Sequence, residues 1–404
     1  MLKKIRTSDL RLGMYLHELC GSWMEHPFWR SKFTLTDPED IKRIRESGIA
    51  EAWIDTDKGL DVLGGAKAET EESVTDLLME AEIAQHGKPI GPVSMSEELR
   101  RAAMICSTAR KAIVSMFQEV RMGNAISAEA AGELVEEISS SVLRNPAALI
   151  SLARLKTADD YTYMHSVAVC ALMVSLARQL GLDENEVREA GMAGLLHDLG
   201  KALMPMDVLN KPGKLTDDEF RIIKSHPVEG HRLLVEGKTY SDIVLDVCLH
   251  HHEKIDGSGY PDRLGGDSIS LFAKMGAVCD VYDAITSNRP YKAGWDPAES
   301  IRKMAEWSTG HFDERVFQAF IKSIGIYPVG SLVMLSSSRL AVVLEQSEKS
   351  LLAPRVKVFF STKSQTYIVP EVIDLSRPSA TEKIISHETA AKWGIKNLDE
   401  LWTT

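Results

Sequence analysis

The sequence predicts a mainly α-helical protein in which a helical bundle follows a small α+β domain and precedes a short β-rich extension. Apolar residues recur at helical spacing from residue 95 to about residue 325. Short strand-like runs occupy the first 62 residues and the residues after 328, and a chain of 404 residues is too long for one ordinary hydrophobic core. The predicted segments are an α+β domain over 1–65, an acidic linker over 66–94, connecting helices over 95–144, a helical domain over 145–328 and a β-rich extension over 329–404.

The N-terminal segment alternates strand-like runs with one helix. Asp37 is a suitable N-cap, Pro38 suits the first helical position and Gly48 ends the pattern. A cluster of aromatic residues between two of the strands is expected to form core or interface rather than a ligand site. Its members are Trp23, Phe28 and Trp29, together with Pro27. The expected strands are Lys3–Arg6, Met14–Leu19, Phe33–Leu35 and Ala50–Ile54.

The middle of the chain is predicted to be a linker followed by helices. Residues 66–85 are polar and rich in glutamate, and the sequence GKPIGP over 87–92 favours a break before the next helix. Gly123 and Asn124 close the first helical pattern. After residue 330 the pattern changes to Val, Phe and Tyr-rich runs separated by turns, with one more helical pattern over 388–401. The expected strands are 331–335, 340–344, 355–360 and 366–370.

Composition and charge exclude some classes of function. The net charge of -11 disfavours binding of a nucleic acid polymer, because nonspecific affinity for phosphates comes from cationic side chains. A small anionic ligand remains possible where metals or a few cations create local positive charge. Five cysteines are scattered without a C-x-x-C pair, so we expect reduced, mostly buried thiols in a cytoplasmic protein. No stretch approaches 18 uncharged apolar residues, so no membrane span is expected.

The stretch GMAGLLHDLGK over residues 191–201 sets His197 beside Asp198 and places Lys201 four residues after His197. Imidazole and carboxylate ligands together suit divalent first-row metals. On a continuous helix Lys201 would share a face with His197 and could reach a metal-bound phosphate. The small residues Gly191 and Gly194 would let this helix pack closely on its neighbours. One His-Asp pair is expected about once by chance among 12 histidines, so other segments must support the interpretation.

Four further segments carry potential ligands. The tripled histidine over 250–252 favours metal ligation, since such runs are rare outside metal sites. Asp280 and Asp283 share one face of an otherwise apolar helix and would be costly to bury unpaired. His165 and His226, taken singly, are more typical of structural histidines, and Pro227 biases His226 away from helical conformation. Five independent coincidences are nevertheless a poor explanation of the whole set.

Two loops add groups suited to a phosphate-containing ligand. The sequence DGSGYP over 256–261 places glycines around a serine and then Tyr260, so its backbone could approach a ligand closely and its ring could stack. The sequence SNRPYK over 287–292 supplies Arg289 and Lys292, and Arg289 can bind phosphate in a bidentate fashion.

Over residues 145–328 the chain resembles the HD-GYP family of bacterial cyclic di-GMP phosphodiesterases. The resemblance rests on YTYMHS, HDLGK, KPGKLTDDEF, KSHP, HHEKIDGSGYP and DVYDAITSNRPYK. It implies that 145–328 is the catalytic domain, and that residues 1–62 are a domain of undefined function that often precedes it in this family. The implied metal ligands are His165, His197, Asp198, His226, His251, His252 and Asp280. The implied substrate contacts are Lys201, Asp283, Arg289 and Lys292, together with the loop residues Gly259, Tyr260 and Pro261.

The resemblance also implies two metal ions. Members that bind a third ion carry a glutamate where this chain has Tyr161, so a binuclear centre is favoured, although Asp160 nearby keeps the question open. His250 is given no ligand role. Iron or manganese is expected rather than zinc, because the donors are imidazoles and carboxylates without thiolate.

The function expected is hydrolysis of cyclic di-GMP to pGpG, GMP or both, with His197, Asp198 and Lys201 as catalytic residues. One alternative is a phosphodiesterase for 3',3'-cyclic GMP-AMP or another nucleotide. Another is a non-catalytic sensor that signals through a partner, for example a protein with a diguanylate-cyclase domain. A homodimer is also possible.

Overall fold

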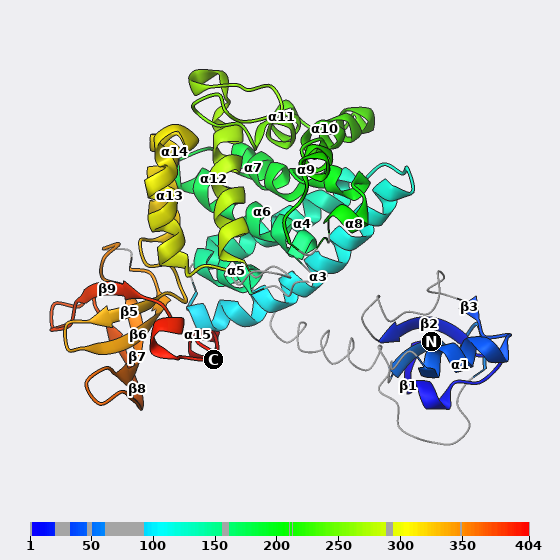
Figure 1. Ribbon diagram of the computed structural model, residues 1–404, viewed down its shortest axis with the longest axis horizontal. Coiled ribbons are helices and arrows are strands. Elements are labelled where there is room, and N and C mark those ends of the chain that lie inside the picture. The colour runs from blue at the N-terminus through cyan, green and yellow to red at the C-terminus, as the bar shows by residue number, and fades with distance from the viewer. Residues whose placement is uncertain are drawn as a thin grey trace. The chain divides into compact units, whose positions relative to one another are not determined.

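The computed structural model describes residues 2–20, 33–46, 51–60, 93–155, 161–209, 211, 213–287, 294–347 and 350–403 (Figure 1). The chain divides into two compact units, Met1–Lys88 and Pro89–Thr404. Each unit is described by itself. No described helix is both long enough and apolar enough to cross a membrane.

The first unit is a small α+β domain, as predicted. Its antiparallel sheet has the strand order β1-β4-β2-β3, and the described residues also form the short 3-10 helix η1 (Thr7–Asp9) and the helix α1 (Pro38–Glu46). Asp37 accepts a hydrogen bond from the backbone of Glu39, which satisfies a free N–H at the start of this helix. Met14, Leu16 and Ile54 are among the fully buried core residues. The strands are β1 (Leu2–Arg6), β2 (Tyr15–Cys20), β3 (Phe33–Thr34) and β4 (Glu51–Asp55). The aromatic cluster at residues 23–29 and Gly48 lie outside the described residues.

The second unit is dominated by helices, and most of them begin at a side-chain cap. Ser94, Ser127, Ser241 and Ser270 each accept a hydrogen bond from the backbone of the first helical turn. The helices are α3 (Met95–Arg121), α4 (Ala128–Arg144), α5 (Pro146–Arg154), α6 (Tyr161–Gln179), α7 (Glu184–Leu196), η3 (Leu199–Leu203), α8 (Met206–Leu209), α9 (Asp217–Ile223), α10 (His226–Gly237), α11 (Asp242–His250), η4 (Gly266–Ser268), α12 (Leu271–Thr286), α13 (Pro297–His311) and α14 (Glu314–Ile324).

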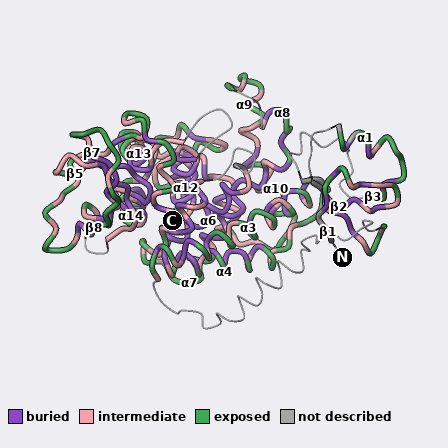
Figure 2. The backbone as a smooth tube through the Cα atoms, turned by 90° about the horizontal axis from the view of Figure 1, so that it is seen from below, coloured by how far each residue is buried: buried purple, intermediate pink, exposed green. Residues whose placement is uncertain are grey.

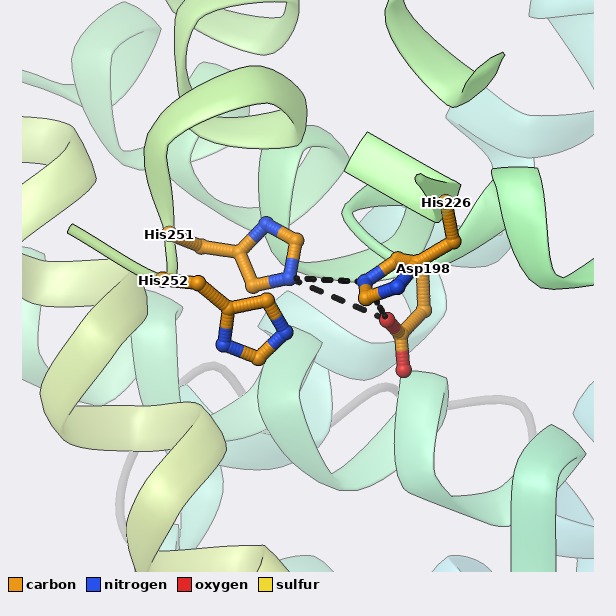
Figure 3. Close-up of side chains that lie close together, drawn as sticks. All are labelled: Asp198, His226, His251 and His252. Carbon is orange, nitrogen blue, oxygen red and sulfur yellow. Dashed lines mark hydrogen bonds and ion pairs between the residues drawn. The ribbon is translucent and has the colours of Figure 1, made fainter. Parts of the chain in front are cut away.

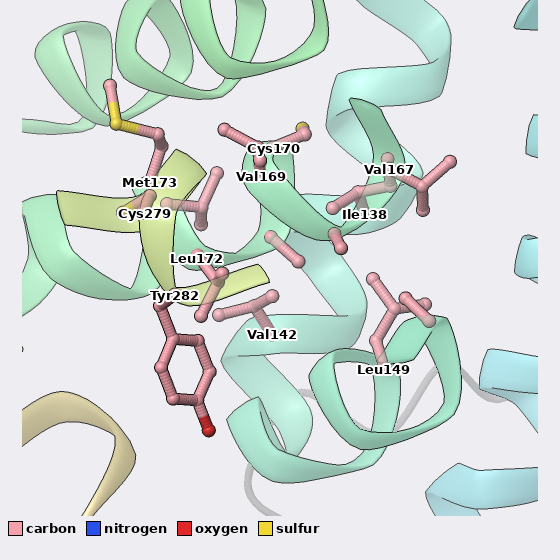
Figure 4. Packing of buried hydrophobic residues seen from close by; sticks show 14 of the residues in the cluster. Ile138, Val142, Leu149, Val167, Val169, Cys170, Leu172, Met173, Cys279 and Tyr282 are labelled. Atoms are coloured by element: carbon pink, nitrogen blue, oxygen red, sulfur yellow. The ribbon is translucent and has the colours of Figure 1, made fainter. Parts of the chain in front are cut away.

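Helix α6 lies at the centre of the bundle because it is apolar on every side. Figure 2 colours most of α6 and α12 as buried, and Figure 4 shows Leu172 of α6 packed near Val142 of α4 and Tyr282 of α12. A Cβ atom on Gly194 would lie 2.9 Å from the backbone of Cys170, so α7 packs against α6 almost backbone to backbone. The predicted close packing of the small residues is confirmed. The ligands on both helices are thereby held at a fixed separation.

A buried ion pair fixes the start of α3. Glu98 is fully buried and accepts hydrogen bonds from Arg144 Nε at 2.7 Å, Arg144 Nη2 at 2.8 Å and Ser141 Oγ at 2.8 Å. Both partners lie on α4. The pair therefore joins the N-terminal end of α3 to the C-terminal end of α4.

Replacement of Glu98 by alanine is expected to lower the free energy of unfolding by about 3 to 5 kcal/mol, because it leaves the Arg144 guanidinium largely buried and without its carboxylate. The measurement is denaturant unfolding followed by circular dichroism. Glu97→Ala is the matched control, since Glu97 is its exposed neighbour on the same helix turn and pairs only with Arg101 among the described ion pairs. A change in Glu98→Ala no larger than that in the control would contradict the prediction.

The C-terminal extension is an antiparallel sheet with the strand order β8-β7-β6-β5-β9. Its core is continuous with the helical core through residues such as Leu332, Met334 and Trp402. The strands are β5 (Leu332–Leu335), β6 (Arg339–Glu345), β7 (Arg355–Ser361), β8 (Thr366–Asp374) and β9 (Ile384–Glu388).

The prediction for the last residues was partly wrong. Strand β9 was not predicted, and the helical pattern expected over 388–401 is two short pieces, η5 (Ala391–Trp393) and α15 (Glu400–Thr403). Gly394 between them adopts a φ of +63°, which ends the first piece. β9 is stabilised by pairing with β5, about 50 residues earlier, and such long-range pairing leaves little signal in local sequence.

An ion pair between His387 of β9 and Asp296 at the start of α13 joins the extension to the helices. His387 Nε2 lies 2.9 Å from Asp296 Oδ1, and His387 Nδ1 lies 3.9 Å from Glu299 Oε2. Burial alone would lower the pKa of His387, but these carboxylates raise it above its ordinary value.

Because the pKa of His387 is higher in the folded protein, its charge stabilises the fold fully below the unfolded pKa, and this contribution is lost as the pH rises through the folded pKa. We expect the wild type to exceed His387→Gln in unfolding free energy by about 0.5 to 1 kcal/mol at acidic pH and by less at alkaline pH. Urea unfolding of both proteins at about pH 5.5 and about pH 9 measures this difference. A difference that grows with pH would have the wrong sign.

Candidate metal centre

The His-Asp pair lies where α7 ends and a short 3-10 helix begins. His197 is the C-cap of α7, and Asp198, with φ -99° and ψ 11°, precedes η3. The prediction that Lys201 continues the same α-helix is therefore wrong. The tighter turn instead brings the Lys201 ammonium directly to Asp198 Oδ2, three residues earlier.

The structure brings all seven predicted metal ligands together. They come from α6, the α7–η3 junction, the start of α10, the end of α11 and the middle of α12. Their ligand atoms form two groups in which all atoms lie within 4.8 Å of one another. One group is Asp198, His226, His251 and His252 (Figure 3), and the other is His165, His197 and Asp280.

His226 is the first residue of α10, so the prediction that Pro227 keeps it out of helical conformation is wrong. Proline is tolerated in the first helical turn, where its missing N–H has no partner to lose. His226 thus receives its orientation from the start of a helix rather than from a loop.

The two oxygens of Asp198 face different groups. Oδ1 lies 3.1 Å from His226 Nε2 and 3.8 Å from His251 Nε2, whereas Oδ2 lies 3.4 Å from both His165 Nε2 and His197 Nε2. Ligand atoms that share an ion at about 2.1 Å are about 3 to 3.5 Å apart, so these separations suit common ions. Asp198 could therefore offer one oxygen to an ion held by each group.

Asp280 has a similar arrangement. Its Oδ1 lies 3.0 Å from His165 Nε2 and 3.9 Å from His197 Nε2, and its Oδ2 lies 3.6 Å from His252 Nδ1. The second carboxylate therefore also touches both groups.

Three imidazole rings are oriented by backbone carbonyls. The Nδ1 atom of His197 is 2.8 Å from the oxygen of Gly194, that of His226 is 2.7 Å from Ile223, and that of His251 is 3.0 Å from Val247. Donation from Nδ1 leaves the Nε2 lone pair free to bind a metal.

The donor set fits a pair of metal ions for a second reason. Among the described residues, His197 Nε2 and Asp198 Oδ1 are buried and have no partner in regular hydrogen-bond geometry, although His226 Nε2 lies 3.1 Å from Asp198 Oδ1. A buried polar atom without a partner costs free energy. Coordination of a cation would satisfy both atoms.

The charge states of His251, His252 and Asp198 favour metal binding. Burial lowers the pKa of His252 to about 3 and holds the pKa of His251 well below its usual value, so both rings are neutral. Burial would raise the pKa of Asp198, but the Lys201 ammonium and the neighbouring imidazoles hold it well below the usual range. Neutral imidazoles and ionised carboxylates are the forms that bind metals.

Asp283 lies beside a ligand rather than at the open side of the site. It is buried, and its Oδ2 is 2.6 Å from His165 Nδ1, while its Oδ1 accepts a hydrogen bond from Ser287 Oγ at 3.2 Å. This arrangement orients His165 as a carboxylate–histidine–metal unit. The contact of Asp283 with the substrate stays a prediction beside this positioning role.

The loop over 256–261 lies against the ligands. The Tyr260 ring stacks on His252 with centroids 4.7 Å apart, and Lys224 Nζ lies 5.0 Å from the Tyr260 centroid. Gly259 admits no side chain, because a Cβ atom there would lie 2.5 Å from Glu253 Cα. Pro261 follows in the same loop.

Sequence reasoning missed the residues that hold this loop. The backbone N–H of Asp262 donates to Glu253 Oε1 at 2.7 Å. His250 lies outside both ligand groups and contacts Asp262 at 3.0 Å and Asp246 at 2.7 Å. The sequence did offer one signal for the role of His250. It is the last residue of α11, directly before the candidate ligands His251 and His252.

Some predicted features lie outside the described residues. Arg289, Lys292 and Asp160 are among them, as is the side chain of Tyr161, so their predicted roles stay predictions. Four cysteines are free thiols, and three of these, Cys170, Cys248 and Cys279, are buried. Cys248 lies near the site, but its Sγ packs against Gly230.

Comparison with known proteins gives matches over the whole chain. A family model described as a domain of unknown function matches residues 2–131, beyond the predicted domain 1–65, and a model described as an HD domain matches residues 140–316. The cyclic di-GMP phosphodiesterase PA4108 of Pseudomonas aeruginosa is 57% identical over 408 residues, which cover 100% of this chain and 96% of that protein.

Two further similarities are more partial. The 3'3'-cGAMP-specific phosphodiesterase 1 of Vibrio cholerae is 34% identical over 166 residues, 41% of this chain and 38% of that protein. The solved structure of Bd1817, a HDG"Y"P protein from Bdellovibrio bacteriovorus, superposes with a TM-score of 0.52 at 19% identity over 80% of this chain and 99% of that one. The structural similarity shows the fold alone.

Proposed function

Because this chain belongs to the HD-GYP family of HD-domain phosphohydrolases, we propose that it is a metal-dependent phosphodiesterase that hydrolyses cyclic di-GMP to pGpG, GMP or both. The observation that carries the proposal is the convergence of seven candidate ligands in two groups. Asp198 belongs to the first group and has its second oxygen 3.4 Å from two histidines of the other, and Lys201 lies beside it. The near full-length similarity to a cyclic di-GMP phosphodiesterase supports the choice of substrate.

Two divalent ions fit the donor set, one held by Asp198, His226, His251 and His252, and the other by His165, His197 and Asp280 with Asp198 shared. Bound there, such ions supply an activated water and neutralise phosphate charge. We propose iron or manganese, since no thiol lies among the ligands.

The chain's own groups would perform three tasks. The Lys201 ammonium, one-fifth exposed and adjacent to Asp198, is placed to stabilise charge on a phosphate oxygen. Tyr260 shapes the edge of the site by stacking on His252. Asp283 holds His165 in one orientation. Arg289 and Lys292 are proposed to contact the substrate from the loop after α12.

A second substrate is favoured by one observation. A 3'3'-cGAMP-specific phosphodiesterase is 34% identical over 41% of this chain, so 3',3'-cyclic GMP-AMP is the alternative substrate. Contact with a diguanylate-cyclase domain, homodimer formation and a cytoplasmic location stay predictions from the sequence.

Product chromatography tests the proposal. Manganese-loaded protein is incubated separately with cyclic di-GMP and 3',3'-cyclic GMP-AMP, and the rates of formation of linear dinucleotide and mononucleotide are compared. We expect faster hydrolysis of cyclic di-GMP. Binding of both dinucleotides without any product would support a sensor instead, and faster hydrolysis of the hybrid dinucleotide would reassign the substrate.

Removal of the metals is expected to destabilise the fold as well as abolish activity, because the two groups then leave buried carboxylates and ring nitrogens without cations. Metal at about 100 times its dissociation constant stabilises by about 2.7 kcal/mol per site. The melting temperature should therefore fall after dialysis against a chelator and recover, together with activity, when manganese is added. An unchanged melting temperature on complete metal loss would contradict this prediction.

A further inference from the structure

The turn that carries Lys201 is held by an arginine from a distant helix. Arg121 is the last residue of α3, and its Nε donates a hydrogen bond to the backbone oxygen of Ala202 at 2.9 Å. Its Nη2 lies 2.8 Å from Met206 Sδ, just beyond η3. Arg121 and Ala202 are 81 residues apart in the sequence. The guanidinium therefore ties the end of α3 to the residue that follows Lys201.

The other neighbour of Lys201 is fixed as well. A Cβ atom on Gly200 would lie 1.9 Å from the backbone oxygen of His226 and 2.6 Å from the backbone nitrogen of Gly230, so η3 touches α10 backbone to backbone. Lys201 thus lies between one residue packed on α10 and one residue bonded to Arg121. Its own backbone has no freedom to shift without breaking one of these contacts.

We propose that Arg121 is a positioning residue for Lys201, an inference that rests on the proposed phosphodiesterase function. A charge-assisted hydrogen bond from a guanidinium is stronger than a neutral one, and a planar fork restricts the direction of approach. The Lys201 ammonium acts on phosphate only within hydrogen-bond reach, and small displacements of a catalytic group lower the rate steeply. The bond to Ala202 keeps the start of that side chain in place.

The matched control for Arg121 is Arg100. Both arginines lie on α3 and both are exposed, but Arg100 lies near the opposite end of the helix from the contact with η3. Replacement of either by alanine removes one positive charge from an exposed position of the same helix. We expect Arg121→Ala to lower kcat/KM for cyclic di-GMP about tenfold and Arg100→Ala to lower it less than twofold, with equal metal content in both.

A double-mutant cycle separates positioning from a general structural effect. If Arg121 acts through Lys201, Arg121→Ala should cause less than a twofold further loss in a Lys201→Ala background. The same cycle is repeated by measuring the dissociation constant of inorganic phosphate for the four manganese-loaded proteins. No variant can hydrolyse inorganic phosphate, so this measurement does not depend on activity. This second readout decides the case even if Lys201→Ala has no measurable turnover.

Three outcomes would overturn the inference. They are a tenfold loss that persists in the Lys201→Ala background, an Arg121→Ala variant with the activity and phosphate affinity of the control, and loss of metal from Arg121→Ala. Failure of the proposed function would give another result, because the wild type itself would then not hydrolyse cyclic di-GMP. The double-mutant cycle in phosphate affinity could still be measured in that case.

Discussion

Replacement of Asp198 by alanine is expected to lower kcat/KM for cyclic di-GMP by at least about a thousandfold and to remove both metal ions. The reason is that its two oxygens serve different ligand groups, so one substitution takes a donor from each. Steady-state kinetics and metal analysis by mass spectrometry of the purified protein measure the two effects. The double replacement of His197 and Asp198 by alanine should behave in the same way.

The control for this experiment is Asp207→Ala, which removes an exposed aspartate of α8 in the same domain. Its activity and metal content should match the wild type. The far-ultraviolet circular dichroism of Asp198→Ala should keep its helical signal, because the apolar packing of α6 and α12 does not involve this carboxylate. Retained activity in a folded, metal-free Asp198→Ala protein would refute the metal-dependent mechanism.

The second large effect is expected from Gly200→Ala, one of the smallest possible changes. The added Cβ would lie 1.9 Å from the backbone oxygen of His226, and no side-chain rotation can relieve a clash between two backbones. Either η3 or α10 must move by more than 1 Å, and this displaces Lys201 or His226. We expect kcat/KM to fall by about a hundredfold or more and the free energy of unfolding to fall by about 3 kcal/mol.

Gly132→Ala is the matched control, because Gly132 lies in α4 and a Cβ atom there would meet nothing within 4 Å. This replacement should stabilise the protein by about 0.5 to 1 kcal/mol through helix propensity and leave the kinetics unchanged. Parallel thermal melts and kinetics of the two variants give the comparison. Wild-type activity in Gly200→Ala would contradict the prediction, because it would show that η3 and α10 can separate without displacing Lys201 or His226.

The set of candidate ligands could be selected from the sequence because each one sits in a short motif, and the structure brings them together. Their geometry could not be predicted. The spacing of four residues predicted that Lys201 would lie on the same helix face as His197. The backbone instead changes to a 3-10 turn, which brings Lys201 to Asp198. Likewise, the local preference of a residue before proline argued against a helical His226, yet the start of α10 accommodates it. Both errors arise because packing of η3 against α10 decides the backbone, and that packing involves residues distant in sequence.

The same distinction applies to the residues around the ligands. Asp283 was visible as a carboxylate on the ligand helix, but its task depends on the position of His165, 118 residues earlier. His250 was given no ligand role from the sequence, and only the structure connects it to Asp262. In the C-terminal extension four strands were evident from alternating apolar runs, and the fifth, β9, depends on its partner.

The order of the strands in the extension affects how the chain can fold as it is made. β5 is the first strand of this sheet to leave the ribosome and β9 is the last, yet the two are neighbours in the finished sheet. Until β9 has been made, one side of β5 presents unpaired backbone groups, which can template association with other chains. Synthesis of β9 is therefore the step that covers this edge of β5, and nascent chains stalled before residue 384 would be the ones most exposed to aggregation.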